Sequence, residues 1–222
     1  MKYTVNMRFL TALLITLVTL TASAQKKFEG IIEYQMTYEN LPSEMAGMES
    51  MFPQKQRIVM SKNFSRMDQE LGMGGNMVVI SDAKQSDYRM YMNAMGKKIK
   101  IALPEEEINK SKEKAGDINI EYVDETMEVL GYECKKAIIK NGEDEITVFY
   151  TEKIPVPSIQ EQFNQLKGFP LYYQMEKSGM TINVTATKVE EEKVDKSEFE
   201  DLEGYEEMSL EDYKALMGGG GQ

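Results

Sequence analysis

The side chains available for acid–base chemistry are mainly carboxylates, because the 222 residues include 37 Asp and Glu and no histidine. Without histidine, the chain can form no Ser-His-Asp triad, no Cys-His pair and no His-containing metal site. Two runs of three glutamates stand at 105–107 and 190–192. Adjacent residues of a strand point to opposite faces, so neighbours in such a run do not share one substrate. We interpret both runs as solvated surface and predict that the chain is not an enzyme.

Cys134 is the single cysteine, so no disulfide within the chain and no cysteine cluster for zinc can form. Two interpretations of Cys134 are open: a thiolate activated by Lys135 and Lys136, or a small core residue on a strand. We favour the core residue, because no histidine base is present. The 72–75 turn lacks the Gly-Lys-Ser/Thr ending of a phosphate loop, and no D-x-D-x-D-G calcium loop occurs. We therefore predict no metal and no cofactor.

Methionine is in excess, with 18 residues, and its spacing allows three interpretations. Met45, Met48 and Met51 recur at intervals of three, and Met90 and Met92 form a second close group. Thioether side chains are flexible and polarizable, so they fill irregular cores, line adaptable apolar pockets or capture copper(I). We take the ordinary core and the apolar pocket as the main alternatives.

The first residues predict a cleaved export signal. Lys2 and Arg8 precede an apolar run at 9–20, and a small-x-small cleavage site ends at Ala24. Export predicts a periplasmic or outer-membrane-associated protein. The net charge of −11 argues against nucleic acid as a partner, and we expect contact with a membrane to be peripheral at most. The predicted organisation is a signal peptide at 1–24, a single domain at 25–217 and a flexible glycine tail at 218–222.

Alternating apolar and polar residues predict strands over most of the domain, with the clearest runs at 32–38, 146–150, 169–175 and 180–187. The turn signals Asn141-Gly142 and Ser178-Gly179 join consecutive runs, which is typical of an antiparallel meander. Helical spacing is confined to 41–52, 158–166 and 210–217, and the charged 105–114 segment predicts a solvated loop or helical turn. The pattern predicts a mainly β (α+β) fold of about ten strands with two or three short helices. A closed barrel, a half barrel and a sandwich all satisfy it.

Five short motifs resemble those of known bacterial families. In chain order they lie at 131–137, 148–155, 167–171, 195–199 and 204–208. Their order resembles a secreted family of Bacteroidetes-type bacteria, domain of unknown function 4412. The ending, with Asp195, Ser197 and Phe199 before Gly204-Tyr205, is similar to the periplasmic lipoprotein-carrier (LolA/LolB-like) superfamily. That resemblance implies a strongly curved antiparallel sheet or half barrel with short helices on a concave face. It also implies that this face binds acyl chains, and it implies no catalysis.

The first functional prediction is a non-catalytic cell-envelope protein that binds a lipid or other amphiphile on the concave apolar face, with the helical segment 45–52 as a lid. The candidate lid and cavity residues are Met45, Met48, Met51, Phe52, Tyr34, Met36, Met90, Met92, Ile182 and Val184. The alternative is an interaction module whose partner is another envelope protein. Such a module would fill its core with its own side chains and hold no ligand.

Overall fold

Twelve strands form one sheet in the computed structural model, which describes residues 28–114, 118–142 and 144–218. The predicted signal segment 1–24 and all but the first residue of the predicted tail lie outside the described residues. The strands are β1 (Gly30–Glu39), β2 (Lys55–Ser61), β3 (Phe64–Leu71), β4 (Gly75–Asp82), β5 (Asp87–Ala94), β6 (Lys97–Leu103), β7 (Asn119–Val129), β8 (Tyr132–Asn141), β9 (Asp144–Thr151), β10 (Phe169–Lys177), β11 (Met180–Glu191) and β12 (Glu206–Glu207).

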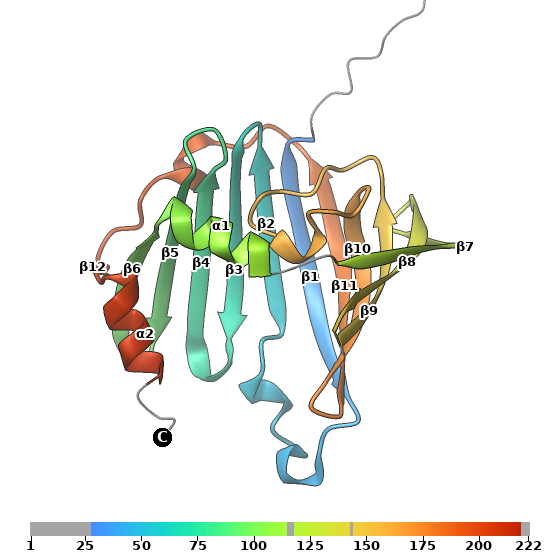
Figure 1. The fold of residues 1–222 in the computed structure, drawn as a ribbon, viewed down its shortest axis with the longest axis horizontal. Helices are drawn as coiled ribbons and strands as arrows, with labels where there is room; N and C mark the ends of the chain where they lie inside the picture. The colour runs from blue at the N-terminus through green and yellow to red at the C-terminus, as the bar shows by residue number, and fades with distance from the viewer. Residues whose placement is uncertain (1–27, 115–117, 143, 219–222) are drawn as a thin grey trace, which may run out of the picture.

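Neighbouring strands follow the order β12-β6-β5-β4-β3-β2-β1-β11-β10-β9-β8-β7, so the described sheet is open, with β12 and β7 at its edges. The main strands pair antiparallel, and the short β12 pairs parallel with β6. The predicted mainly β fold is confirmed, with twelve strands instead of about ten. Figure 1 shows the sheet bending at its β7–β9 end, and α1 (Glu105–Lys114) and the 152–168 segment lie over one face. We call this the concave face.

Strand register decides which side chains share the concave face, because directly opposed residues of neighbouring strands point to the same side. One row of opposed residues crosses β1 to β6 as Ile32, Ile58, Met67, Val79, Met90 and Ile101. The next row is Tyr34, Gln56, Gln69, Met77, Met92 and Ile99. Residues between these positions along each strand point to the opposite, convex face.

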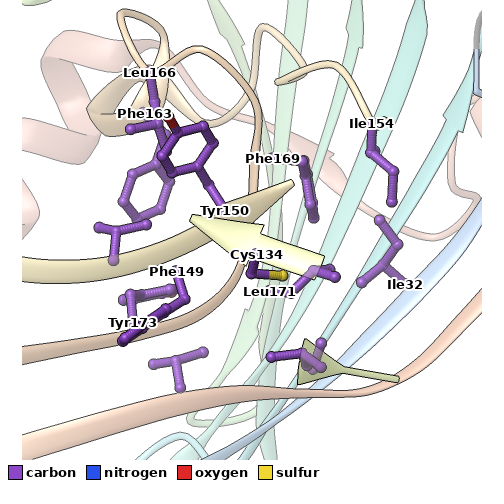
Figure 2. Packing of buried hydrophobic residues seen from close by; sticks show 14 of the residues in the cluster. Ile32, Cys134, Phe149, Tyr150, Ile154, Phe163, Leu166, Phe169, Leu171 and Tyr173 are labelled. Carbon is purple, nitrogen blue, oxygen red and sulfur yellow. The ribbon is translucent and has the colours of Figure 1, made fainter. Parts of the chain in front are cut away.

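The half of the concave face on β1 and β8–β11 is filled by the chain itself. The 152–168 segment buries Ile154, Phe163 and Leu166 against strand residues that include Phe169, Leu171 and Tyr173 (Figure 2), and we call this cluster the larger core. The Phe163 ring meets the Tyr173 ring edge to face, with centroids 5.0 Å apart. Burial of each such side chain stabilises the fold by roughly 1.5–3 kcal/mol. This half therefore has a closed core.

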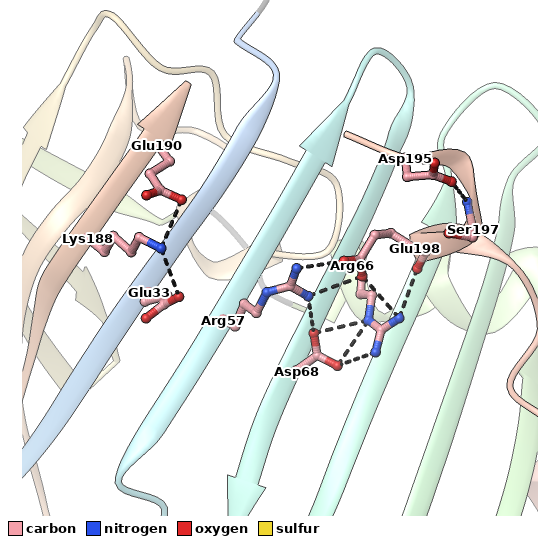
Figure 3. Close-up of polar contacts among 9 residues, drawn as sticks. All are labelled: Glu33, Arg57, Arg66, Asp68, Lys188, Glu190, Asp195, Ser197 and Glu198. Atoms are coloured by element: carbon pink, nitrogen blue, oxygen red, sulfur yellow. Dashed lines mark hydrogen bonds and ion pairs between the residues drawn. The ribbon is translucent and has the colours of Figure 1, made fainter. Parts of the chain in front are cut away.

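The convex face is covered in part by the C-terminal strap, residues 194–205, which contains the short helix η5 (Lys196–Phe199). Val194 and Phe199 of the strap are buried in a second core together with Val59, Val78, Ile80 and Tyr91. Beside this core, Arg57 and Arg66 of the sheet form ion pairs with Glu198 of the strap (Figure 3). The strap thus holds the C-terminal part of the chain against the sheet by both apolar and ionic contacts.

Two of the three expected helices are wrong in type. The 41–52 pattern predicts one helix, but the chain forms two 3-10 turns, η1 (Ser43–Met45) and η2 (Glu49–Met51). Gly47 lies between them with φ +80°, which is outside the right-handed helical region and breaks the helix. The 158–166 pattern yields only the 3-10 turn η4 (Glu161–Phe163), and a further one, η3 (Gly72–Gly74), joins β3 to β4.

The third expected helix is confirmed as α2 (Leu210–Gly218). The Asp212 amide donates to the Ser209 hydroxyl at 3.0 Å, which caps the first turn. The charged 105–114 segment, predicted as a loop or helical turn, forms the ten-residue helix α1, whose three leading glutamates stabilise the positive end of its dipole. Among the described residues, no helix is long and apolar enough to cross a membrane.

Candidate binding face

The other half of the concave face, on β3–β6, is lined with apolar side chains that remain half-buried. Met67, Met77, Val79, Met90 and Met92 lie on it in the two opposed rows that cross the sheet, and Met67 also packs against the filled half. The predicted lining residues Met90 and Met92 are therefore neighbours here, and the other three join them. We call these five side chains the open Met face.

A cavity of about 420 Å³ continues the open Met face beside α1. This volume lies within the range of roughly 300–1,000 Å³ that is typical of small-molecule sites. An ion pair of 2.6 Å between Lys214 Nζ and Glu107 Oε2 joins α2 to α1 at the cavity, and it holds the pKa of the Glu107 carboxyl below its ordinary value. The cavity is lined by Val79, Tyr88, Leu103, Glu107, Ile108, Ser158, Ile159, Gln162, Leu210 and Lys214.

Four other predicted lining residues lie in the filled half. Tyr34, Met36 and Val184 belong to the larger core, and Ile182 packs against it. The Tyr34 hydroxyl donates to the Pro170 carbonyl oxygen at 2.6 Å, and burial raises the pKa of the Tyr34 phenol well above its ordinary value. The structure thus brings these four together, separately from Met90 and Met92.

The lid candidates lie in the β1–β2 loop at one end of the sheet (Figure 1). The side chains of Met45, Met48 and Met51 are 37–42% exposed, and the Phe52 ring packs on Tyr38 with centroids 5.1 Å apart. The loop touches the β3–β4 turn, since a Cβ on Gly72 would lie 1.6 Å from the Met51 carbonyl oxygen. The lid candidates therefore form a loop beside the end of the open Met face, and no helix crosses that face from 41–52.

Cys134 is a core residue. Its side chain has no exposed surface, and burial raises the pKa of its thiol to about 11. An activated thiolate requires the opposite shift, so the core interpretation is confirmed. Among the described residues, no group of three His, Cys, Asp or Glu side chains is placed to hold a metal ion.

Sequence reasoning missed the cavity beside α1. Ile108 of α1 is only 6% exposed, although the rest of its helix is polar and mostly charged. A single apolar residue in a charged helix marks the side that contacts the rest of the protein, and this signal was available in the sequence. Val79 and Tyr88 gave no comparable signal, because their place in the cavity depends on the strand register and on the position of α1.

Comparison with known proteins gives one family match, to the N-glycanase peptide N-terminal domain, over residues 32–214. The chain belongs to this family. The resemblance to domain of unknown function 4412 has no matching finding and stays a prediction. No curated protein matches the chain.

PNGF-II, in two crystal forms, has the same fold as this chain. They superpose with a TM-score of 0.54 at 20% and 21% identity, over 85% and 86% of the chain. The chain covers 33% and 32% of PNGF-II, so it spans about a third of that protein's length. A weaker similarity, with a TM-score of 0.39 and 10% identity, relates 75% of the chain to 89% of lipoprotein LppX of Mycobacterium tuberculosis.

Proposed function

We propose that this member of the N-glycanase N-terminal domain family is a non-catalytic binding domain of the cell envelope. Its ligand is the hydrocarbon chain of a lipid or other amphiphile, which lies along the open Met face and enters the cavity beside α1. The observation that carries the proposal is the continuity of these two features, because Val79 belongs to both.

The residues of the open Met face suit a hydrocarbon chain. Met77 and Met92 are opposed across β4 and β5, as are Val79 and Met90, so two apolar pairs run side by side along the strands. Methionine adapts its shape to an irregular ligand without a large cost in free energy. Each methylene group transferred from water to such a face contributes about 0.8 kcal/mol, so a chain of ordinary length binds without a charged anchor.

The absence of histidine and the burial of Cys134 support a role without catalysis in this chain. The family match also supports a non-catalytic role. The matched family is an N-terminal domain, and the chain covers only a third of PNGF-II. Chemistry on a glycan or peptide is therefore not assigned to the residues described here.

The second candidate function is a protein–protein interaction module of the envelope. The filled half of the concave face favours it, because Phe163, Phe169 and Leu171 there are fully buried by the chain's own segments. This candidate predicts that the open Met face contacts a protein partner and takes up no soluble amphiphile.

A binding titration with a soluble fluorescent fatty acid, below its micelle concentration, separates the two candidates. Met92→Asp places a charge on the open Met face, and Asn93→Asp is the matched control, because it adds the same charge at the next residue of β5 on the convex face. We expect Met92→Asp to weaken binding at least about tenfold, since burying a carboxylate beside a hydrocarbon chain is costly, and Asn93→Asp to bind like the wild type. Equal affinities of the two variants, or no binding by the wild-type chain, would refute the proposal.

A further inference from the structure

Five well-exposed methionines gather at one end of the sheet. Met45, Met48 and Met51 are 37–42% exposed in the β1–β2 loop, Met73 is 81% exposed in the β3–β4 turn, and Met95 is fully exposed in the β5–β6 turn. Large exposed apolar side chains that gather in one place mark an interaction site more often than scattered ones do.

Topology explains why these loops lie together. Strands β1 to β6 are consecutive neighbours and antiparallel, so the connections β1–β2, β3–β4 and β5–β6 all leave the same end of the sheet. The connections at the other end of these strands, 62–63 and 83–86, contain no methionine. We call the end that carries the five methionines the Met rim.

Two residues of the Met rim occupy backbone positions that their side chains do not favour. Met73 has φ +62° and Met95 has φ +53°, and each precedes a glycine with φ +77°. Met95-Gly96 is the two-residue hairpin turn in which Asn, Asp or Gly is preferred at the first position, whereas Met73 is the middle residue of the three-residue connection Gly72–Gly74. Ser178-Gly179, with φ +54° and +77°, shows that the chain also builds the two-residue turn with a polar residue. An apolar residue held in the left-handed region at a fully exposed tip indicates a role outside the fold's own stability.

The Met rim is continuous with the open Met face. Gly72 lies directly against the Met51 carbonyl oxygen, so the β1–β2 loop and the β3–β4 turn form one surface. Two residues of the open Met face lie near the Met rim. Met77 of β4 is two residues from Gly75, and Met92 of β5 is three residues from Met95. An apolar path therefore leads from the exposed tips along the concave face to the cavity.

Charge at the Met rim identifies the kind of surface that it fits. The Met rim carries both signs of charge, with Glu44 and Glu49 in the 40–54 loop and the exposed Lys97 and Lys98 directly after Met95-Gly96, and the whole chain carries a net charge of −11. Binding at a membrane interface combines buried apolar area with electrostatic attraction or repulsion by the headgroups. Zwitterionic headgroups carry both signs of charge, as the Met rim does, and they do not repel the negative net charge of the chain, so the exposed methionines insert beneath them.

We propose that the Met rim docks on a lipid surface with zwitterionic headgroups and inserts the tips of Met73 and Met95 below the headgroup level. This inference rests on the proposed function, because it names the surface from which the amphiphile passes to the open Met face. Docking and ligand binding are nevertheless measured separately, so that failure of one does not mimic failure of the other.

The test is flotation of the chain with phosphatidylcholine vesicles. The double variant Met73→Asn/Met95→Asn removes both apolar tips and leaves the turns intact, because asparagine tolerates a positive φ better than methionine does. Leu130→Asn is the matched control: Leu130 is 48% exposed and has φ +52° before Gly131, but it lies in the β7–β8 turn, at the opposite end.

We expect the double variant to lose at least about tenfold in vesicle partitioning, because two exposed apolar side chains no longer enter the bilayer. Leu130→Asn should float like the wild type, and both variants should bind the soluble fluorescent fatty acid with wild-type affinity. Addition of phosphatidylglycerol should weaken flotation of the wild type. No flotation of the wild type, equal flotation of the double variant, or stronger binding to phosphatidylglycerol vesicles would overturn the proposal.

Discussion

Arg57 and Glu198 lie 141 residues apart in the chain, and the guanidinium of Arg57 donates to both carboxylate oxygens of Glu198, at 2.7 and 3.2 Å. Arg66 also lies within ion-pair distance of Glu198, at 3.4 Å. The hydrogen bond from Arg57 holds the pKa of the Glu198 carboxyl below its ordinary value. This pair ties the C-terminal strap to β2 on the convex face.

Glu198→Gln is expected to destabilise the chain at pH 7 by about 1 kcal/mol, the usual upper value for a partly exposed ion pair. The folded-state pKa of Glu198 is lowered, so its stabilisation is complete above the unfolded pKa of about 4.3 and is lost as the pH falls through the folded value. Thermal unfolding from pH 7 to pH 2 should show the wild type and the variant converging below about pH 4. Glu200→Gln, two residues away and exposed, is the control and should change little at any pH. A difference that stays constant down to pH 2 would contradict the ionic role of Glu198.

Phe163→Ala is expected to lower the free energy of unfolding by about 3–5 kcal/mol, because it leaves a cavity in a closed core. Phe163 is fully buried by the 152–168 segment and meets the Tyr173 ring. Urea unfolding measures the change, with Leu216→Ala as the control, since Leu216 of α2 is 55% exposed. A loss for Phe163→Ala below about 1 kcal/mol would mean that the segment does not close this half of the face.

Cys134 is expected to resist alkylation in the native chain. Its thiol is fully buried and its pKa is raised to about 11, so at pH 8 the thiolate is scarce and inaccessible. The rate of iodoacetamide labelling, followed by mass, should be at least about a hundredfold slower in the folded chain than in urea, because the reaction requires the exposed thiolate. Fast labelling of the folded chain would show that β8 opens readily.

The β1–β2 loop is expected to contribute to ligand binding without contributing to stability. The double variant Met48→Asp/Met51→Asp should abolish binding of the fluorescent fatty acid, because this loop contacts the β3–β4 turn at the end of the open Met face. Because both side chains are exposed, the free energy of unfolding should change by less than about 0.5 kcal/mol. Leu130→Asp, at the opposite end of the sheet, is the control and should bind normally. Wild-type affinity of the double variant would remove the loop from the proposed site.

The sequence predicted the class of fold well, because alternation of apolar and polar residues is a local signal. The runs at 32–38 and 180–187 became β1 and β11, and Ser178-Gly179 became the turn between β10 and β11. Helix type was less predictable. The i, i+4, i+7 spacing at 41–52 resembles a helix, but Gly47 adopts a positive φ and leaves two 3-10 turns.

The site was predicted only in part. Met90 and Met92 were assigned to an apolar face, and the structure places them on one that is open. Tyr34 and Val184 have the same alternation in the sequence, yet they lie in the closed core. The difference comes from the 152–168 segment, which fills one half of the concave face, whereas in the other half the segment and α1 leave a cavity and half-buried side chains.

The amino-acid sequence by itself determined the mainly β fold, the absence of histidine chemistry and the excess of methionine, because these follow from composition and from periods of a few residues. Only the tertiary structure decided which methionines are exposed and which half of the concave face is filled. Both depend on contacts between residues far apart in the chain, such as Tyr34 with Phe169 in the larger core and Glu198 with Arg57 on the convex face. Local sequence carries no signal for such pairs, since they form only when the strands have paired and the connecting segments have packed on them.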